Sequence, residues 1–141
     1  LEVTESALLR EPQTALQNLR ALQSRGARIS VDDFGTGYSS MSYLKRLPIH
    51  TLKVDRSFVK DMLTDDADAV IVRSTIGLAH SFGLNVVAEG VEDEDTLQAL
   101  RHLQCEQAQG YHISRPVSAD EFNRWYQDRL QKNPANPNFT L

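Results

Sequence analysis

Short runs of apolar and β-branched residues alternate with longer stretches of helical periodicity, and this alternation constrains the fold more than any other feature. The runs occupy residues 1–4, 28–31, 51–54, 85–88 and 108–113. Runs of this length with β-branched residues are typical of strands. A repeated strand–helix order predicts a parallel sheet covered by helices. We therefore predict an α/β fold of about five βα units.

The stretches between these runs carry the start and stop signals of helices. Leu16, Leu19 and Leu22 recur at helical spacing over residues 13–25, and Gly26 suits the position after a helix end. Further helices are predicted from about Ser39 to Pro48, from Asp65 or Asp66 to Gly83, from Asp93 through Leu103, and from the capping pair Ser118 and Glu121 onward. Residues 131–141 show no period, and we expect a loose tail there.

Polar side chains stand at the carboxyl end of every predicted strand. They are Glu5, Asp32 with Asp33, Asp55, Glu89 and Gln109. A single acid at such a place commonly caps the next helix, but the co-location of all of them favours a functional site, because barrel folds carry their chemistry on this face. An open doubly wound sheet is the competing architecture, yet its G-x-G-x-x-G fingerprint is absent from the sequence. A closed barrel needs about 250 residues, so 141 residues predict part of a TIM-like (β/α) barrel.

Several carboxylates at one edge of a sheet make a site of hard oxygen ligands. Such a site suits Mg²⁺ or Mn²⁺ rather than Zn²⁺. The adjacent Asp32 and Asp33 would repel each other without a cation, and one of them could bridge two metal ions. Two metal ions roughly 4 Å apart stabilise the attacking and the leaving oxygen in phosphodiester hydrolysis. Lys53 could hold the attacking water or neutralise a phosphate oxygen.

Five segments of the sequence resemble the motifs of the EAL domain family of cyclic di-GMP phosphodiesterases. They are Glu2-Val3-Thr4-Glu5-Ser6, Asp32-Asp33-Phe34-Gly35-Thr36-Gly37-Tyr38-Ser39-Ser40, Lys53-Val54-Asp55 with Ser57-Phe58-Val59, Ala88-Glu89-Gly90-Val91-Glu92, and Gln109-Gly110-Tyr111 with Pro116. The second of these is highly specific. The resemblance covers residues 1–125, and no motif position in that span is substituted.

The resemblance implies roles for the polar residues at this edge. Glu2 would bind the first metal ion, Asp32 would bridge both ions, and Asp33 would bind the second. Glu89 would serve the second ion through water or act as a base. The other implied catalytic residues are Lys53, which would contact the attacking water, and Gln109, which would hydrogen-bond in the same network.

A glycine-containing loop is expected to couple the site to a homodimer interface. The resemblance implies that Glu5 holds this loop, which consists of Phe34, Gly35, Thr36, Gly37, Tyr38, Ser39 and Ser40. Gly35 and Gly37 permit backbone conformations that other residues resist, so the loop could change shape. The dimer would form through this loop and the helix that follows it.

The family resemblance implies an enzyme that hydrolyses cyclic di-GMP to linear pGpG with Mg²⁺ or Mn²⁺. The Glu-Ala-Leu signature and an Asn-bearing strand of the family would lie before Leu1, and the chain starts within a predicted strand. We therefore expect residues 1–130 to be the C-terminal part of an EAL domain that is inactive by itself, fused in its parent to upstream sensory or GGDEF domains. A catalytically silent cyclic di-GMP receptor is the alternative, and a purely dimerising domain is a third possibility.

Composition excludes several other classes of function. The net charge of −4 argues against a nucleic-acid binder. No apolar stretch is long enough to span a membrane, so we expect a cytoplasmic domain whose parent could be anchored through upstream segments. The single Cys105 is expected to be a packing residue, and the four histidines form no zinc pattern. Phe122, Trp125 and Tyr126 are expected to lie in a core or an interface.

Overall fold

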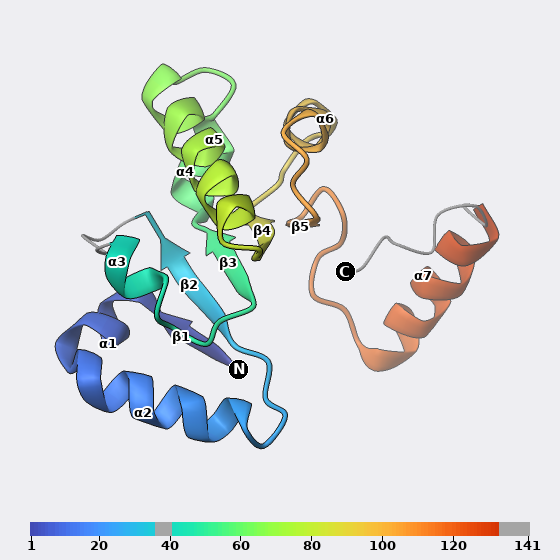
Figure 1. Cartoon of the computed structure of the whole chain (residues 1–141). Helices are drawn as coiled ribbons and strands as arrows, with labels where there is room; N and C mark the ends of the chain where they lie inside the picture. Colours follow the sequence, from blue (N-terminus) through green and yellow to red (C-terminus); the bar gives the residue numbers. More distant parts are fainter. Residues whose placement is uncertain (36–40, 133–141) are drawn as a thin grey trace.

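Five strands form one parallel sheet in which sequence neighbours are also spatial neighbours. The structure is a computed structural model, and it describes residues 1–35 and 41–132. The strands β1 (Glu2–Thr4), β2 (Ser30–Phe34), β3 (Thr51–Val54), β4 (Asn85–Glu89) and β5 (Gln107–Gln109) pair in the order β1-β2-β3-β4-β5 (Figure 1). This confirms the predicted α/β class with a parallel sheet.

The order of the strands distinguishes the predicted barrel from the competing doubly wound sheet. In a doubly wound sheet the strand order reverses at a switch point. Here the order advances in one direction from β1 to β5, with a helix after each of β1 to β4. This is the progression of a (β/α) barrel, so the fold is part of a TIM-like barrel and the doubly wound alternative is wrong.

Helices occupy the predicted intervals and two places that were not predicted. Their bounds are α1 (Glu5–Arg10), α2 (Pro12–Gln23), α3 (Met41–Leu44), α4 (Arg56–Asp61), α5 (Asp66–Ser81), α6 (Glu94–His102) and α7 (Ala119–Lys132). The predictions that correspond to α2, α5, α6 and α7 are confirmed. Neither α1 nor α4 is predicted, because each spans six residues and is too short to show a helical period.

Capping side chains begin most of these helices, as their sequence signals indicate. The Asp65 carboxylate accepts the N–H of Ala67 at 2.7 Å, and the Asp93 carboxylate accepts that of Thr96 at 2.7 Å. Ser118 and Glu121 form the predicted capping box: the Ser118 N–H donates to the Glu121 carboxylate at 3.0 Å, and the Glu121 N–H donates to the Ser118 hydroxyl at 3.4 Å. Each contact satisfies a backbone donor that the helix start leaves unpaired.

Two strands differ in extent from the sequence prediction. β2 spans Ser30–Phe34 rather than residues 28–31, so it contains both adjacent aspartates. β5 ends at Gln109, whereas the prediction continued it to residue 113. The chain turns after Gln109: the N–H groups of Ile113 and Ser114 both donate to the carbonyl of Gly110, at 3.0 and 3.1 Å. A strand cannot continue through such a turn.

The core lies between the sheet and the helices that cover its outer face. Leu52 and Val54 of β3 and Val86 of β4 are fully buried in one hydrophobic cluster with Val72 and Ile76 of α5 (Figure 1). Cys105 packs against the same cluster, as predicted. Burial of its thiol raises its pKa to about 11, which keeps the thiol protonated and unreactive near neutral pH.

α7 stands to one side of the sheet, beyond β5 (Figure 1). Phe122 and Tyr126 are exposed, so they do not belong to the core of the described residues. The sequence predicted a place in either a core or an interface, and an interface stays a prediction. α7 includes Gln131 and Lys132, and the rest of the expected loose tail lies outside the described residues. Within the described ranges, no helix has the length and apolar composition needed to cross a membrane.

Candidate active site

The carboxyl ends of the five strands meet at one edge of the sheet and bring the predicted polar residues to that edge. Parallel pairing aligns Thr4 with Asp32, and Glu89 with Gln109. Glu5 and Asp55 directly follow β1 and β3. The sequence-predicted residues therefore share one edge, as expected for strands that run in the same direction.

Lys53 is the centre of this edge. Its ammonium lies 2.7 Å from the Glu89 carboxylate, 3.0 Å from that of Glu2 and 3.2 Å from that of Asp32. The side chain of Lys53 is only 7% exposed, against 24% for Asp32 and 59% for Glu2. These four residues, which we call the Lys53 cluster, come from four neighbouring strands. Tertiary structure thus brings together four residues that are far apart in the sequence.

The carboxylates hold Lys53 in its charged form. Burial by itself lowers the pKa of Lys53, but hydrogen bonds to Glu89, Glu2 and Asp32 outweigh burial, and the pKa is raised well above its ordinary value. A lysine that keeps its proton at neutral pH can donate hydrogen bonds and stabilise negative charge. It cannot accept a proton, so Lys53 is not a general base.

Asp33 turns away from the regular strand beside the Lys53 cluster. Its φ is +55°, a left-handed conformation that aspartate tolerates better than most residues, and its N–H donates to the Asp32 carboxylate at 3.1 Å. The pairing between β2 and β3 is irregular between Val31 and Phe34, which redirects the side chains there. The pKa of Asp33 is raised, first by burial and then by the negative charges of Asp32 and Asp55.

Asp55 is a candidate that the sequence-based roles do not include. It interacts electrostatically with Asp33, and it accepts hydrogen bonds from the N–H of Ser57 at 2.8 Å and from the Ser57 hydroxyl. Burial raises the pKa of Asp55, but the contacts with Ser57 outweigh it and lower the pKa. The signal for Asp55 was its place directly after a strand, but that place also suits the helix cap that it forms for α4.

Glu5 connects β1 with the start of the glycine-containing loop. It is 2% exposed, and its carboxylate accepts the N–H of Gly35 at 3.2 Å. Gly35 has a φ of +103°, which favours glycine. This contact agrees with the anchoring role that the resemblance implies. Phe34 and Gly35 are described, whereas Thr36, Gly37, Tyr38, Ser39 and Ser40 lie outside the described residues.

The segments that follow β3, β4 and β5 pack closely against one another. At Gly90 and Gly110 the packing leaves no space for a side chain. A Cβ atom on Gly90, whose φ is +74°, would lie 2.5 Å from the Cβ of Arg56. A Cβ atom on Gly110 would lie 2.1 Å from the carbonyl oxygen of Val91. The N–H of Val91 also donates to the carbonyl of Gln109 at 3.1 Å. This nesting holds the ends of β4 and β5 in register.

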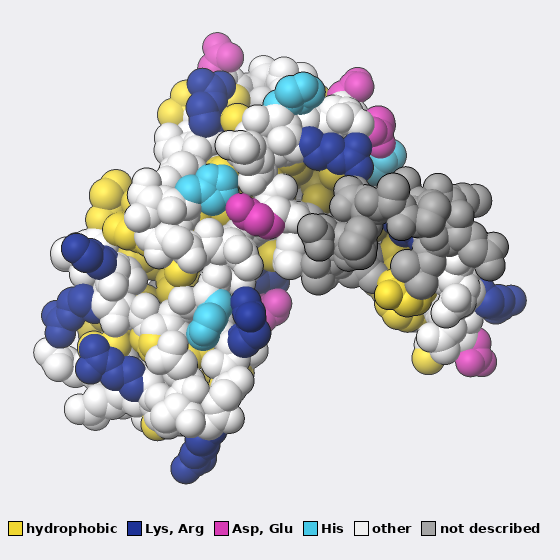
Figure 2. All heavy atoms as spheres, turned by 45° about the vertical axis from the view of Figure 1, so that its right-hand side comes forward, with side chains coloured by type: hydrophobic (Ala, Val, Ile, Leu, Met, Phe, Trp, Pro, Cys, Tyr) yellow, Lys and Arg dark blue, Asp and Glu magenta, His cyan; other side chains and the backbone are white. Residues whose placement is uncertain are grey.

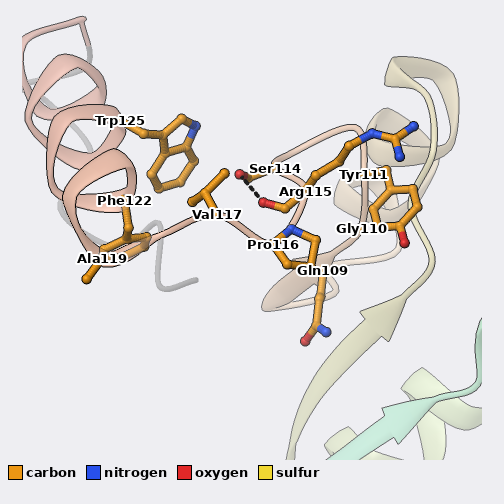
Figure 3. Close-up of a pocket in the computed structure, with 10 residues that line it drawn as sticks. All are labelled: Gln109, Gly110, Tyr111, Ser114, Arg115, Pro116, Val117, Ala119, Phe122 and Trp125. Atoms are coloured by element: carbon orange, nitrogen blue, oxygen red, sulfur yellow. Dashed lines mark hydrogen bonds between the residues drawn. The ribbon is translucent and has the colours of Figure 1, made fainter.

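Gln109 is at the margin of the site rather than inside the Lys53 cluster. Its backbone aligns with Glu89, but within the described part of the chain no hydrogen bond joins its side-chain amide to Lys53 or Glu89. Gln109 instead borders a cavity of about 590 Å³ between the loop after β5 and α7, with Phe122 and Trp125 on the opposite wall and its amide directed away from them (Figure 3). The catalytic contact implied for Gln109 therefore stays a prediction.

The oxygen ligands at this edge fit hard divalent cations in type. Carboxylates are the preferred side-chain ligands of Mg²⁺ and Mn²⁺. In the described residues, however, no three His, Cys, Asp or Glu side chains are grouped closely enough to hold one ion. The carboxylates of Glu2, Asp32 and Glu89 face the Lys53 ammonium instead. Water or further protein ligands would have to complete the shell of a metal ion bound here.

Comparison with known proteins extends this picture. Residues 1–116 match the family model of the EAL domain. MucR of Pseudomonas aeruginosa, named as a bifunctional diguanylate cyclase/cyclic di-GMP phosphodiesterase, is 46% identical over 121 residues, which are 86% of this chain and 18% of MucR. NbdA of the same species, named as a cyclic di-GMP phosphodiesterase, is 46% identical over 129 residues, which are 89% of this chain and 16% of NbdA.

A solved structure is similar in fold as well as in sequence. The structure described as PaMucR phosphodiesterase in complex with c-di-GMP has a TM-score of 0.84 and 45% identity, and the match covers 86% of this chain and 49% of that one. The chain thus spans about half of that solved structure and less than a fifth of the curated relatives MucR and NbdA.

Proposed function

The chain belongs to the EAL domain family, and from this premise we propose that its intact parent domain hydrolyses cyclic di-GMP to linear pGpG with Mg²⁺ or Mn²⁺. The observation that carries the proposal is the Lys53 cluster, in which a buried ammonium and three carboxylates meet at the carboxyl edge of the sheet. The similarity to MucR and NbdA supports the choice of substrate.

Metal ions would bind at the acidic side chains of this edge. Two divalent cations would activate a water molecule and stabilise the leaving oxygen. Glu2 and Asp32 would hold the first ion, since both carboxylates contact the Lys53 ammonium. Asp32 and Asp33, which are adjacent in β2, would hold the second. The raised pKa of Asp33 supports this role, because a cation would relieve the crowding of negative charge there.

The other residues of the cluster would act on water and phosphate. Lys53 would donate hydrogen bonds to the attacking water or to a phosphate oxygen, because its raised pKa keeps it charged. Glu89 would accept the proton of the water or bind the second ion through water. Gln109 would hydrogen-bond within the same network after a change of its side-chain rotamer, since its backbone already lies beside Glu89.

The function belongs to a domain larger than this chain. We propose that residues 1–130 are the C-terminal part of an EAL domain, since the chain spans about half of the similar solved structure. The remaining part would supply further metal ligands, so the chain by itself would have no measurable turnover. The parent would be a cytoplasmic or membrane-anchored homodimer that couples through residues 34–40, with sensory or GGDEF domains upstream.

Turnover by the intact domain tests the proposal. The parent domain is assayed with cyclic di-GMP and Mn²⁺, and pGpG is separated by chromatography. Asp32→Asn is expected to lower the rate at least about a hundredfold, because metal-held charge contributes several kcal/mol in the transition state. Asp66→Asn, on the exposed start of α5, is the control and is expected to leave the rate unchanged.

One outcome would count against an enzyme, and another against the role of Asp32. Tight binding of cyclic di-GMP without any pGpG would indicate the receptor instead. An Asp32→Asn variant that keeps more than about a tenth of the rate would show that Asp32 bridges no metal ions, since such a loss is only about 1.4 kcal/mol.

A further inference from the structure

Charge is distributed unevenly over the surface, and nearly all the charges on one face are positive. The whole chain has a net charge of −4. Glu11 is nevertheless the only acidic residue between Ser6 and Val31, and none occurs between Met41 and Leu52. The cations of these two segments form what we call the α2 basic face: Arg10, Arg20, Arg25, Arg28, Lys45 and Arg46.

The cations of the α2 basic face are exposed and not neutralised by neighbouring acids. All of them are exposed, and none forms a salt bridge with another described residue. This contrasts with Lys53, which contacts three carboxylates, and with Arg101, which pairs with Glu94. Their charge therefore acts outward, on whatever approaches this side of the molecule.

Packing spreads these cations along the length of α2. Leu16 and Leu19 bury one side of α2, so the other side faces outward. The hydroxyl of Tyr43 in α3 donates to the carbonyls of Leu8 at 3.0 Å and Pro12 at 3.1 Å, which places α3 against the start of α2. Lys45 and Arg46 follow α3, while Arg25 and Arg28 follow the end of α2. In Figure 2, dark-blue side chains lie along the lower left margin, where no magenta side chain is visible.

Part of the α2 basic face lies at the end of the sheet opposite the candidate active site. The Lys53 cluster lies at the carboxyl ends of the strands, whereas Arg25 and Arg28 follow α2 and precede β2 at the other end. A membrane that contacts Arg25 and Arg28 would therefore approach the end of the sheet that does not carry the Lys53 cluster.

We propose that the α2 basic face binds anionic phospholipid surfaces. The exposed α2 side chains between the cations include Gln13, Gln17 and Asn18, whereas stable protein interfaces have an apolar centre. A broad, polar and unpaired positive surface fits an extended layer of negative headgroups.

Electrostatics makes such binding compatible with the negative net charge of the chain. Attraction acts within a Debye length, about 10 Å at 0.1 M salt. When α2 faces the membrane, the acids of α5 and α6 on other parts of the surface are largely screened. Each Lys or Arg near an anionic leaflet strengthens binding roughly fivefold. The binding is therefore oriented and salt-dependent.

Vesicle flotation tests the proposal on the chain itself. The protein is mixed with phosphatidylcholine vesicles that contain or lack phosphatidylglycerol, at low and physiological ionic strength, and the bound fraction floats while aggregates sink. The chain is expected to float with the anionic vesicles only, and less at higher salt. The triple variant R20Q/R25Q/R28Q is expected to bind about a hundredfold more weakly. The matched control K60Q/R73Q/R124Q removes the same charge from α4, α5 and α7 and is expected to lose less than about threefold.

Each other result overturns the proposal. Absence of flotation with anionic vesicles at low salt shows that the face does not bind membranes. Equal losses in both triple variants show that net charge acts rather than this face. Binding to soluble polyglutamate but not to vesicles would assign the face to an acidic protein. Circular dichroism checks folding, and R10Q/R46Q replaces the triple variant if that variant unfolds, with an expected loss of about twentyfold.

Discussion

β3 and α7 reverse the usual distribution of polar and apolar side chains. β3 buries a lysine, since Lys53 is 6% exposed between Leu52 and Val54, which are fully buried. α7 exposes aromatic rings: Phe122 is 42% and Tyr126 43% exposed. The Lys53 charge is matched by three carboxylates, whereas Phe122 stacks with its helix neighbours Trp125 and Tyr126.

The difference teaches that neighbours, not residue type, decide burial here. β3 has β2 and β4 on its two sides, so even a charged side chain is enclosed when partners surround it. α7 lies beyond β5, which pairs with β4 alone in the described sheet. Because Phe122 and Tyr126 are exposed, the aromatic face of α7, which they form with Trp125, contributes little to the stability of the described fold. An exposed group of large apolar side chains typically marks an interaction surface.

Truncating one side chain in each region gives the largest expected contrast. Leu52→Ala in β3 is expected to lower the free energy of unfolding by about 3–5 kcal/mol, because it removes a fully buried side chain and leaves a cavity. Phe122→Ala in α7 removes a larger side chain but is expected to cost less than about 1 kcal/mol. Urea unfolding of the chain measures both. Equal losses would show that α7 packs as tightly as the sheet.

Removal of the buried charge is the next largest effect. Lys53→Met is expected to lower the free energy of unfolding by about 2–4 kcal/mol at pH 7, because it leaves three carboxylates facing one another without a cation. The exposed Lys60 of α4 is the matched control, and Lys60→Met is expected to change stability by less than about 0.5 kcal/mol. A variant as stable as the wild type would mean that the three carboxylates do not depend on Lys53.

The nested loops after β4 and β5 give a smaller effect. Gly110→Ala is expected to cost about 2 kcal/mol, since the new methyl group would meet the backbone of Val91 at 2.1 Å and force the loops apart. Gly77→Ala in α5, where nothing lies within 4 Å, is expected to stabilise the chain by about 0.5–1 kcal/mol. Thermal unfolding compares the two. A tolerated Gly110→Ala would show that the register of β4 and β5 does not need this contact.

The smallest expected effect is a pH-dependent change in stability on replacing Asp33. The pKa of Asp33 is raised by burial and by Asp32 and Asp55, so the folded chain holds this proton more tightly than the unfolded chain. Ionisation of Asp33 therefore destabilises the fold as the pH rises above its ordinary value. Asp33→Asn keeps the left-handed backbone accessible and is expected to raise the urea midpoint modestly at pH 7, with no difference below about pH 3.

Asp55, whose pKa is shifted in the opposite direction, provides the control for the titration of Asp33. Burial raises the pKa of Asp55, but its hydrogen bonds to Ser57 lower it overall. Its ionised form therefore stabilises the fold above its ordinary pKa, and this stability is lost as the pH falls through the folded value. Asp55→Asn is expected to lower the urea midpoint at pH 7. If both variants shift in the same direction, the two aspartates do not have opposite environments.

The sequence predicts the strands and long helices well because their signals are local. The run at residues 51–54 matches β3, and the caps at Asp65, Asp93 and Ser118 mark real helix starts. The end of β5 was missed because the residues after Gln109 form a turn closed by the bond from the N–H of Ser114 to the carbonyl of Gly110, and the apolar run at residues 108–113 does not indicate that turn. α1 and α4 are short and owe their formation to caps at Thr4 and Asp55 rather than to a helical period.

By itself, the sequence determined the parallel α/β class, the family, and the set of polar residues at the carboxyl edge, since strand direction follows from the βα order. Only the tertiary structure decided how those residues meet. It placed the Lys53 ammonium among three carboxylates, left the Gln109 side chain at the margin, and exposed the aromatic face of α7. The physical reason is that contact and burial depend on residues distant in the chain, whereas period and capping depend on near neighbours.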